Sequence, residues 1–384
     1  MSQYADEPAH GSDPSDGKKG APTLNRRKPW LIVLLVVLSL FVAACAEEEE
    51  PTDTGGDGAE EVDFLACLVT DTGGVDDKSF NQAGWEGLQR AEEELGVEVQ
   101  FLESQSPNDF QPNINAFIDQ GCNLIVTQGF LLGDATATAA EANPDQNFAI
   151  IDFDFFDVDK GEDVTYDNVK ELTFKTDEAA FLAGYVASSV TESGTLGTYG
   201  GINIPTVTIF MNGFEAGMNH YNEQKDANVK LLGWNSKKQD GLFTGDFENQ
   251  DKGRATTQNL LEEGADVVMP VAGPVGLGSA AAIEDAGEGS LVWVDTDGCV
   301  SAAEFCDLFV TSVLKNISVA VFDTVEEALN EEFEGGLYVG TLENDGVGIA
   351  PFHEFESVVP DDVKQEVETL REGIISGEIS VDGQ

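Results

Sequence analysis

The chain's richest stretch of potentially reactive side chains is the loop DTGGVDDKSFNQ at residues 71–82. It follows an apolar segment typical of a strand, residues 64–70, and leads into a helical pattern. Three carboxylates, an aromatic ring and an amide lie in it, beside two glycines that permit sharp turns. Open α/β sheets bind small molecules at the carboxyl ends of their strands, so we expect this loop to bind a ligand.

Other predicted strands end in side chains of the same kinds. The candidates at strand ends are Asp71, Phe80, Asn81, Gln128, Gly129, Phe130 and Asp152 in the first half, and Gly200, Gly201, Phe243, Phe247, Gly273, Asp295, Asp297 and Lys315 in the second. Such a set suits stacking on a flat ring and hydrogen bonds to hydroxyls or ring nitrogens, and it does not suit covalent chemistry.

Some of these residues also have a simpler structural reading. Asp71 can cap the turn that follows it, which is compatible with touching a ligand, and Asp76 and Asp77 are predicted to serve the loop or cap the next helix. Phe247 competes with Phe243 for one stacking position, and we favour Phe247. The histidines have no partners at a spacing that would indicate a metal site or a general base.

The amino-terminal residues resemble an export signal. An apolar run of about fifteen residues follows three basic residues and is too short for a bilayer span of ~20. It ends in Ala-Ala-Cys like a bacterial lipobox, so residues 1–44 are predicted to be removed and Cys45 to carry a lipid such as palmitate. Residues 45–62 then form an acidic tether, and the protein is expected on the extracytoplasmic face of the cell membrane. An uncleaved anchor helix is the alternative.

The charge is strongly negative, with 19 basic and 72 acidic residues and a formal net charge of −53. Phosphates would be repelled, which excludes nucleic acid as a partner and disfavours an anionic ligand without a local basic pocket. Because the carboxylates are scattered along predicted helices and not clustered, we favour adaptation of the surface to a salty or acidic medium as their explanation.

Four cysteines remain besides Cys45, in a chain addressed to an oxidising compartment. Cys299 and Cys306 lie close together in a turn-like segment, so a local disulfide is predicted. Cys67 and Cys122 fall in or beside neighbouring strands and could form a second. A zinc site of four thiolates is disfavoured, since no CxxC spacing occurs.

The elements that position these side chains alternate between strands and helices. Some ~320 residues follow the tether, more than one core usually serves, so an α/β fold with two lobes is predicted. We assign lobe 1 to residues 63–174 and lobe 2 to 175–340, the latter including a long helix from Lys315. Residues 341–384 form a return segment whose helix packs on lobe 1. The cleft between the lobes is the expected binding site.

Several segments together resemble one known family. They are DTGGVDDKSFNQAGWEG, QGCNLIVTQGF, DEAAFLAGY, YGGINIPTVTIFMNGFEAG, GADVVMPVAG, VDTDG and VTSVLKN, spread over residues 64–318. The chain is thereby similar to the basic membrane protein family, the purine nucleoside receptors of ABC transporters. The resemblance implies a type I periplasmic-binding-protein fold, with two Rossmann-like lobes joined by three crossing strands that close on one nucleoside.

The resemblance also assigns roles to residues. In relatives the base lies between two phenylalanines, matched here by Phe80 and Phe247, while Asp71 and Asn81 match the groups that bond the base edge. A ring stacked on each face of a base contributes ~1–3 kcal/mol per base and tolerates different bases.

The ribose-binding group is matched by Asp295 and Lys315 with the backbone at Gly273. Lys315 would also keep a buried carboxylate paired. Gln128 completes the expected ligand-binding set. The resemblance implies an ABC permease as partner; we expect a monomer, without cofactor or metal and without catalysis.

Two other functions are compatible with parts of this pattern. A receptor for a sugar or signalling molecule of the same fold would do without two opposed phenylalanines. A nucleoside hydrolase is suggested by DTGGVDD, which resembles the calcium loop of those enzymes. It is disfavoured because glycine stands at Gly73 where that loop needs a carboxylate.

Overall fold

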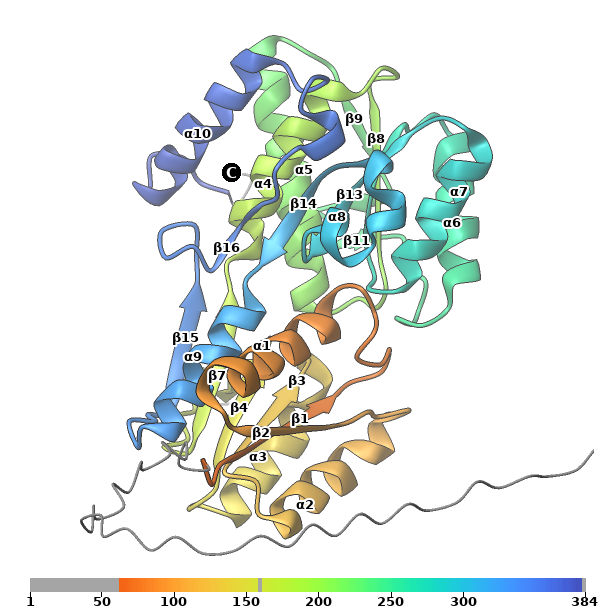
Figure 1. Cartoon of the computed structure of the whole chain (residues 1–384). Coiled ribbons are helices and arrows are strands. Elements are labelled where there is room, and N and C mark those ends of the chain that lie inside the picture. Colours follow the sequence, from red (N-terminus) through yellow and green to blue (C-terminus); the bar gives the residue numbers. More distant parts are fainter. Residues whose placement is uncertain (1–61, 158–160, 382–384) are drawn as a thin grey trace, which may run out of the picture. The chain divides into compact units, whose positions relative to one another are not determined.

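The computed structural model describes residues 62–157 and 161–381, which fold into two α/β lobes (Figure 1). The predicted signal, Cys45 and the tether up to residue 61 lie outside these ranges. Over the described ranges, no helix has both the length and the apolar character that crossing a bilayer requires.

The first lobe is built on six parallel strands in the order β15-β7-β4-β3-β1-β2. They are β1 (Leu65–Thr70), β2 (Glu98–Leu102), β3 (Leu124–Gln128), β4 (Asn147–Ile151), β7 (Val169–Phe174) and β15 (Gly336–Gly340). One face is covered by α1 (Phe80–Leu95) and α9 (Ile317–Leu329), and the other by α2 (Phe110–Gln120) and α3 (Gly133–Ala142). Burial on both faces explains why these strands read as nearly continuous apolar runs.

The second lobe repeats this plan with the order β16-β14-β13-β12-β8-β9, in which only β16 runs antiparallel among the described strands. They are β8 (Thr195–Gly200), β9 (Lys230–Leu232), β12 (Val267–Val271), β13 (Ser290–Asp295), β14 (Phe309–Lys315) and β16 (Val347–Ile349). The helices α4 (Thr176–Val190), α5 (Pro205–Lys225) and α10 (Asp361–Ile375) lie on one face, and α6 (Gln250–Glu262) and α7 (Val275–Ala286) on the other.

Smaller elements connect these layers. They are the hairpins β5 (Phe156–Asp157) with β6 (Glu162–Asp163) and β10 (Trp234–Asn235) with β11 (Asp240–Gly241), the short helix α8 (Gly298–Ser301), and the 3-10 helices η1 (Pro107–Asp109), η2 (Phe130–Leu132), η3 (Ala303–Leu308) and η4 (His353–Phe355).

Both sheets reverse their strand order at an equivalent place. The reversal falls between β1 and β3 in the first sheet and between β8 and β12 in the second. At such a switch point the connections leave the sheet in opposite directions, which opens a crevice at the strand carboxyl ends. Each lobe therefore has one place suited to a small ligand.

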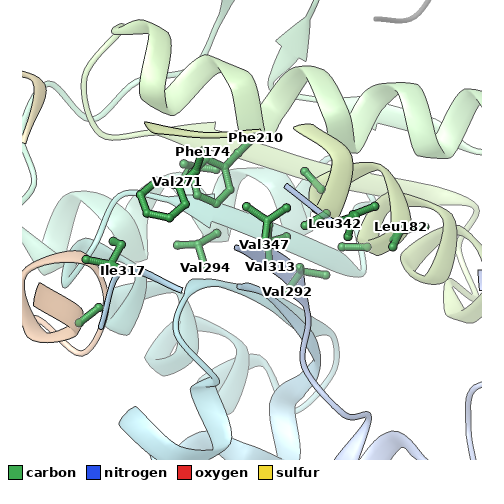
Figure 2. Packing of buried hydrophobic residues seen from close by; sticks show 14 of the residues in the cluster. Phe174, Leu182, Phe210, Val271, Val292, Val294, Val313, Ile317, Leu342 and Val347 are labelled. Atoms are coloured by element: carbon green, nitrogen blue, oxygen red, sulfur yellow. The ribbon is translucent and has the colours of Figure 1, made fainter. Parts of the chain in front are cut away.

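The chain passes between the lobes after β7, after β14 and after β15. One hydrophobic cluster continues across these passages, from Leu68 and Leu88 in the first lobe to Val313 in the second. Figure 2 shows its part beside the hinge, where Phe174 and Phe210 lie next to each other. The three predicted crossings are thus present and anchored in a shared core.

The predicted lobe boundary at residue 340 is wrong. After Lys315 the chain returns to the first lobe, where α9 packs on α1 and β15 pairs with β7. Gly87 permits this packing, because a Cβ there would lie 2.7 Å from the Ser318 carbonyl oxygen and 2.8 Å from Val321 Cβ. Lys315 itself ends β14 and does not begin the predicted helix. Sequence periodicity could not reveal which sheet that helix covers.

The placement predicted for the carboxyl-terminal helix is also wrong. Helix α10 packs on α4 of the second lobe, not on the first lobe. Its apolar side chains, among them Val363 and Leu370, join the shared core. The Lys225 ammonium of α5 lies 2.7 Å from the Glu366 carboxylate of α10. This ion pair also holds α10 against the second lobe.

Both disulfides considered from the sequence are present. Cys299 and Cys306 form the local one that was predicted. Cys67, on β1, is bonded to Cys122, which lies just before β3, so this second bridge ties two neighbouring strands of the first sheet.

Candidate functional site

A cavity lies between the two lobes, at the carboxyl ends of the strands of both sheets. Small-molecule sites are frequently found in such interfaces between lobes. Seven of the eight residues assigned to ligand binding from the sequence line it: Asp71, Phe80, Asn81, Phe247, Gly273, Asp295 and Lys315. The structure thus brings together side chains that are up to 244 positions apart in the chain, from Asp71 to Lys315.

Gln128 is the exception, since it does not line this cavity. It is fully buried, and its side-chain amide nitrogen donates to the carbonyl oxygen of Phe80. Gly84 leaves space for it, because a Cβ there would lie 1.9 Å from Gln128 Oε1. Gln128 therefore supports the start of α1 from beneath, and its expected contact with ligand is not supported.

The Asp71 carboxylate and the Asn81 amide form a pair in the first-lobe wall. Asn81 Nδ2 donates to Asp71 Oδ1 over 3.0 Å. Both residues are buried, at 7% and 1% exposure. Asp71 follows β1 directly and Asn81 lies in the first turn of α1, so the loop folds back to join its two ends.

Asp77 holds that turn of α1 in place. Its carboxylate accepts hydrogen bonds from the backbone amides of Ser79, Asn81 and Gln82 at 2.9, 2.8 and 3.0 Å. These are amides that a helix start leaves without partners. The predicted capping role is confirmed, and Asp77 in addition lines the cavity, which the sequence reading had disfavoured.

Lys315 lies at the centre of a buried charge cluster. Its ammonium bonds the Asp152 carboxylate of the first lobe and lies 3.9 Å from Asp295 Oδ1 of the second. It also lies 4.9 Å from the centre of the Phe80 ring, within cation–π range. Because Lys315 ends the strand that leads into the hinge, one cation connects the hinge to both walls.

Asp152 and Asp295 occupy equivalent positions, immediately after β4 and at the end of β13, and both adopt left-handed backbone angles, with φ of 64° and 67°. Non-glycine residues are uncommon in this region, although aspartate tolerates it. Gly273 has a φ of 54°. The backbone thus turns sharply at the cavity wall in both lobes, as is common at binding sites.

Direct hydrogen bonds join the two lobes beside the cavity. Ser79 Oγ of the first lobe donates to Asp295 Oδ2 of the second over 2.6 Å. Nearby, the Lys78 carbonyl oxygen accepts from Trp293 Nε1 and Thr296 Oγ1, each at 3.1 Å. The loop after β1 therefore touches both the cavity and the opposite lobe.

The two second-lobe phenylalanines differ in where they lie. Phe247 lines the cavity and Phe243 does not. The Phe243 ring packs near Trp234, with ring centres 6.1 Å apart. The Phe247 ring lies against Gly201, where a Cβ would be 2.3 Å from two of the ring carbons. The glycine that follows β8 thus leaves room for the cavity ring.

Burial and like charges strongly affect the carboxyl groups of the cavity. Burial raises the pKa of Asp71 to about 8, opposed by the bond from Asn81 and assisted by neighbouring aspartates. Burial likewise raises the pKa of Asp77 to about 7. It raises the pKa of Asp152 and of Asp295 too, although the Lys315 ammonium counteracts it. The described lining holds four aspartates and one lysine, so it repels anions.

Gly129, Phe130 and Asp152, which the sequence places at strand ends but which were not assigned to ligand binding, also line the cavity. Phe210 was not a candidate at all, because it belongs to the inward face of α5, which looks in the sequence like any core position.

One cluster of possible metal ligands occurs among the described residues, formed by Asp297, Cys299 and His353. The Asp297 carboxylate bonds His353 Nε2 at 2.8 Å. Cys299 is bonded to Cys306 and so offers no thiolate, which is the form that binds metals. The remaining two side chains are hydrogen-bonded to each other.

Comparison with known proteins supplies independent information. A family model described as "ABC transporter substrate-binding protein PnrA-like" matches residues 64–384. An "ABC transporter nucleoside-binding protein BmpA" of Lactococcus lactis subsp. cremoris is 31% identical over 92% of this chain and 99% of its own length. An "uncharacterized lipoprotein" of Pyrococcus furiosus is 29% identical over 91% of this chain and 87% of its own.

A solved structure gives the same result for the fold. An ABC transporter solute-binding protein from Aeropyrum pernix K1 superposes with a TM-score of 0.72 at 26% identity, covering 83% of this chain and 92% of that one. The predicted type I periplasmic-binding-protein fold is confirmed.

Proposed function

We propose, on the basis that the chain belongs to the PnrA-like family of ABC transporter substrate-binding proteins, that it captures a purine nucleoside and delivers it to an ABC importer. The observation that carries the proposal is the composition of the interlobe cavity. Rings from both lobes, Phe80 and Phe247, line one cavity together with the Asp71–Asn81 pair and the Lys315 cluster. A relative named as nucleoside-binding supports the same ligand class.

Each part of the lining suits one part of a nucleoside. Phe80 and Phe247 offer ring faces on which a flat base stacks. Asp71 and Asn81 offer polar atoms to the base edge. Asp295 and Lys315, with the backbone at Gly273, offer the mixed donors and acceptors that bind sugar hydroxyls. A nucleoside is the ligand that can use the stacking rings, the base-edge pair and the sugar-binding group at the same time.

The charges of the lining favour nucleosides over nucleotides. Its four aspartates face one lysine, and that lysine already bonds Asp152. A phosphate would add negative charge where the pKa values of Asp71 and Asp77 are already raised. We therefore expect nucleoside monophosphates to bind at least about tenfold more weakly than nucleosides.

The cellular setting belongs to the same proposal. Residues 1–44 act as an export signal, Cys45 carries the lipid, and the acidic segment tethers a monomeric receptor to the extracytoplasmic face of the membrane. A relative named as a lipoprotein supports the anchor. The partner is an ABC permease, and the protein binds without catalysing a reaction.

Calorimetric titration with nucleosides, nucleotides, free bases and sugars tests the proposal. Phe80→Ala should weaken nucleoside binding by more than tenfold, since one stacking face is lost. Its melting temperature without ligand should change little, because Phe80 is only partly buried. Phe156→Ala is the matched control, since that ring is 52% exposed and does not line the cavity.

Two results would contradict the proposal. One is a protein that binds sugars and no nucleoside, which would favour a sugar receptor of the same fold. The other is full nucleoside affinity in Phe80→Ala, which would remove the stacking role.

A further inference from the structure

The main-chain carbonyl oxygen of Lys78, in the first lobe, is bonded to two side chains of the second lobe. Trp293 Nε1 and Thr296 Oγ1 donate to it, each over 3.1 Å. A carbonyl oxygen has two lone pairs, so these two donors satisfy it completely. We call Lys78, Trp293 and Thr296 the interlobe latch.

The first lobe holds the acceptor of the latch in a fixed place. Lys78 directly follows Asp77, whose carboxylate accepts from the backbone amides of Ser79, Asn81 and Gln82. Lys78 itself has a φ of 61°, in the left-handed region that residues other than glycine seldom adopt. Such a conformation persists only where its surroundings hold it, so the carbonyl group has one orientation on the first turn of α1.

The second lobe holds the Trp293 donor equally firmly. Trp293 lies on β13 and is 0% exposed. The centre of its ring lies 5.2 Å from that of Phe309, and a Cβ on Gly276 would be 2.9 Å from the ring. A ring packed this closely cannot follow a moving partner. The indole N–H therefore meets the Lys78 oxygen in only one orientation of the lobes.

The Thr296 donor belongs to a turn that a disulfide closes. Thr296 follows Asp295, where the backbone turns with a φ of 67°. Ser301 Oγ lies 2.9 Å from Thr296 Oγ1 and thereby restricts the rotation of the hydroxyl. Ser301 ends α8, the short helix that contains Cys299 and is tied to Cys306. This donor is therefore also held in place from within its own lobe.

The latch adjoins the wall of the cavity on both sides. Ser79, the residue after Lys78, donates to Asp295 Oδ2 over 2.6 Å, and Asp295 precedes Thr296. Phe80 and Asp295 line the cavity, whereas the three residues of the latch do not. The latch residues therefore act on a ligand through their neighbours in the chain.

We propose that the interlobe latch holds the two lobes closed and thereby sets the rate at which a bound ligand leaves. This inference rests on the proposed function and makes Trp293 and Thr296 positioning residues that do not touch the ligand. N–H···O hydrogen bonds reach only to about 3.2 Å, so opening of the lobes must break the latch before a ligand leaves. One neutral hydrogen bond changes an equilibrium constant by about threefold to tenfold.

The test is surface plasmon resonance of the immobilised protein with inosine, guanosine and adenosine, which separates association from dissociation. Thr296→Val removes one donor and keeps the shape of the side chain. Dissociation should become about threefold to tenfold faster, because the closed form loses one bond. Association should change by less than about twofold, because the ligand enters while the lobes are open. Thr296→Ser keeps the hydroxyl and should restore slow dissociation.

Two control variants separate the latch from general stability and from side-chain charge. Thr198→Val removes a buried hydroxyl that donates to the Met269 carbonyl oxygen over 2.7 Å within the second lobe. It should lower the melting temperature and leave dissociation unchanged. Lys78→Ala keeps the main-chain acceptor and should also leave dissociation unchanged.

Hydrogen exchange at the Trp293 indole gives a second readout, measured by nuclear magnetic resonance of the nucleoside-bound protein with labelled tryptophan. Since the indole hydrogen is in the latch, its exchange with solvent should be about threefold to tenfold faster in Thr296→Val than in the unaltered protein. Thr198→Val should not accelerate it.

The possible failures are distinguishable. Unchanged dissociation of a bound nucleoside in Thr296→Val, or an equal acceleration in Thr198→Val or Lys78→Ala, overturns the latch while nucleoside capture stands. Absence of binding by all three nucleosides to the unaltered protein overturns the nucleoside function and this inference with it.

Discussion

At the scale of single residues, the cavity depends on glycines that give room to functional side chains. Gly129 leaves space for the Asp71 carboxylate, and Gly201 provides the surface on which the Phe247 ring lies. Gly129 also has a φ of 118°, which side chains other than glycine rarely adopt. These residues bind nothing themselves, yet they decide where the ligand-facing atoms lie.

Gly201→Ala should therefore weaken nucleoside binding, although Gly201 has no side chain with which to contact the ligand. The new methyl would lie 2.3 Å from the Phe247 ring and push it from its seat. We expect a loss of at least about tenfold, similar to removal of one stacking face. Calorimetric titration measures it.

Gly348→Ala is the matched control for that substitution. Gly348 lies on β16, and a Cβ there would meet no atom within 4 Å. If Gly201→Ala binds nucleosides as the unaltered protein does, the ring position is not set by that glycine and the stacking geometry must be revised.

At the scale of elements, the first sheet is the layer that disulfide bonding reinforces most. The Cys67–Cys122 bridge closes a chain separation of 55 residues and ties β1 to the turn just before β3. These strands flank the switch point that carries Asp71 and Gly129. The Cys299–Cys306 bridge closes a separation of only 7 residues, in a peripheral turn.

Removal of the two bridges should consequently have unequal effects on the free energy of unfolding. By loop-closure entropy, replacing Cys67 and Cys122 by serine should cost about 4 kcal/mol, and replacing Cys299 and Cys306 about 2 kcal/mol. Chemical denaturation of the two double variants measures both values. Equal losses, or a larger loss for the short loop, would show that chain entropy does not govern these bridges.

At the scale of the whole molecule, the acidic surface opposes compaction. Most of the formal net charge of −53 falls within the two lobes, where acidic residues far outnumber basic ones. Like charges at this density destabilise the folded state, whereas salt screens them over a Debye length of about 3 Å at 1 M.

Thermal stability should therefore rise with sodium chloride concentration, from about 0.05 M to about 1 M. Scanning calorimetry of the ligand-free protein measures the melting temperature across this range. Sucrose at matched osmolality is the control, because it does not screen charge. A melting temperature that stays constant or falls with salt would show that the carboxylates repel each other too weakly to matter.

The sequence alone determined the alternation of strands and helices, the two lobes, the local Cys299–Cys306 bridge and seven residues of the cavity lining. These follow from local rules: apolar periodicity defines the elements, and parallel strands present their carboxyl ends on one edge. Seven of the predicted residues meet in one cavity for that reason.

Only the tertiary structure decided which sheet the late elements join and which polar atoms remain unpaired. Helix α9 and strand β15 belong to the first lobe and α10 to the second, because their apolar faces find partners far away in the chain. Gln128 turned out to support α1, and Asp77 to line the cavity. Long-range packing and the hydrogen bonds of buried atoms have no signature in local sequence, because they depend on residues that only folding brings together.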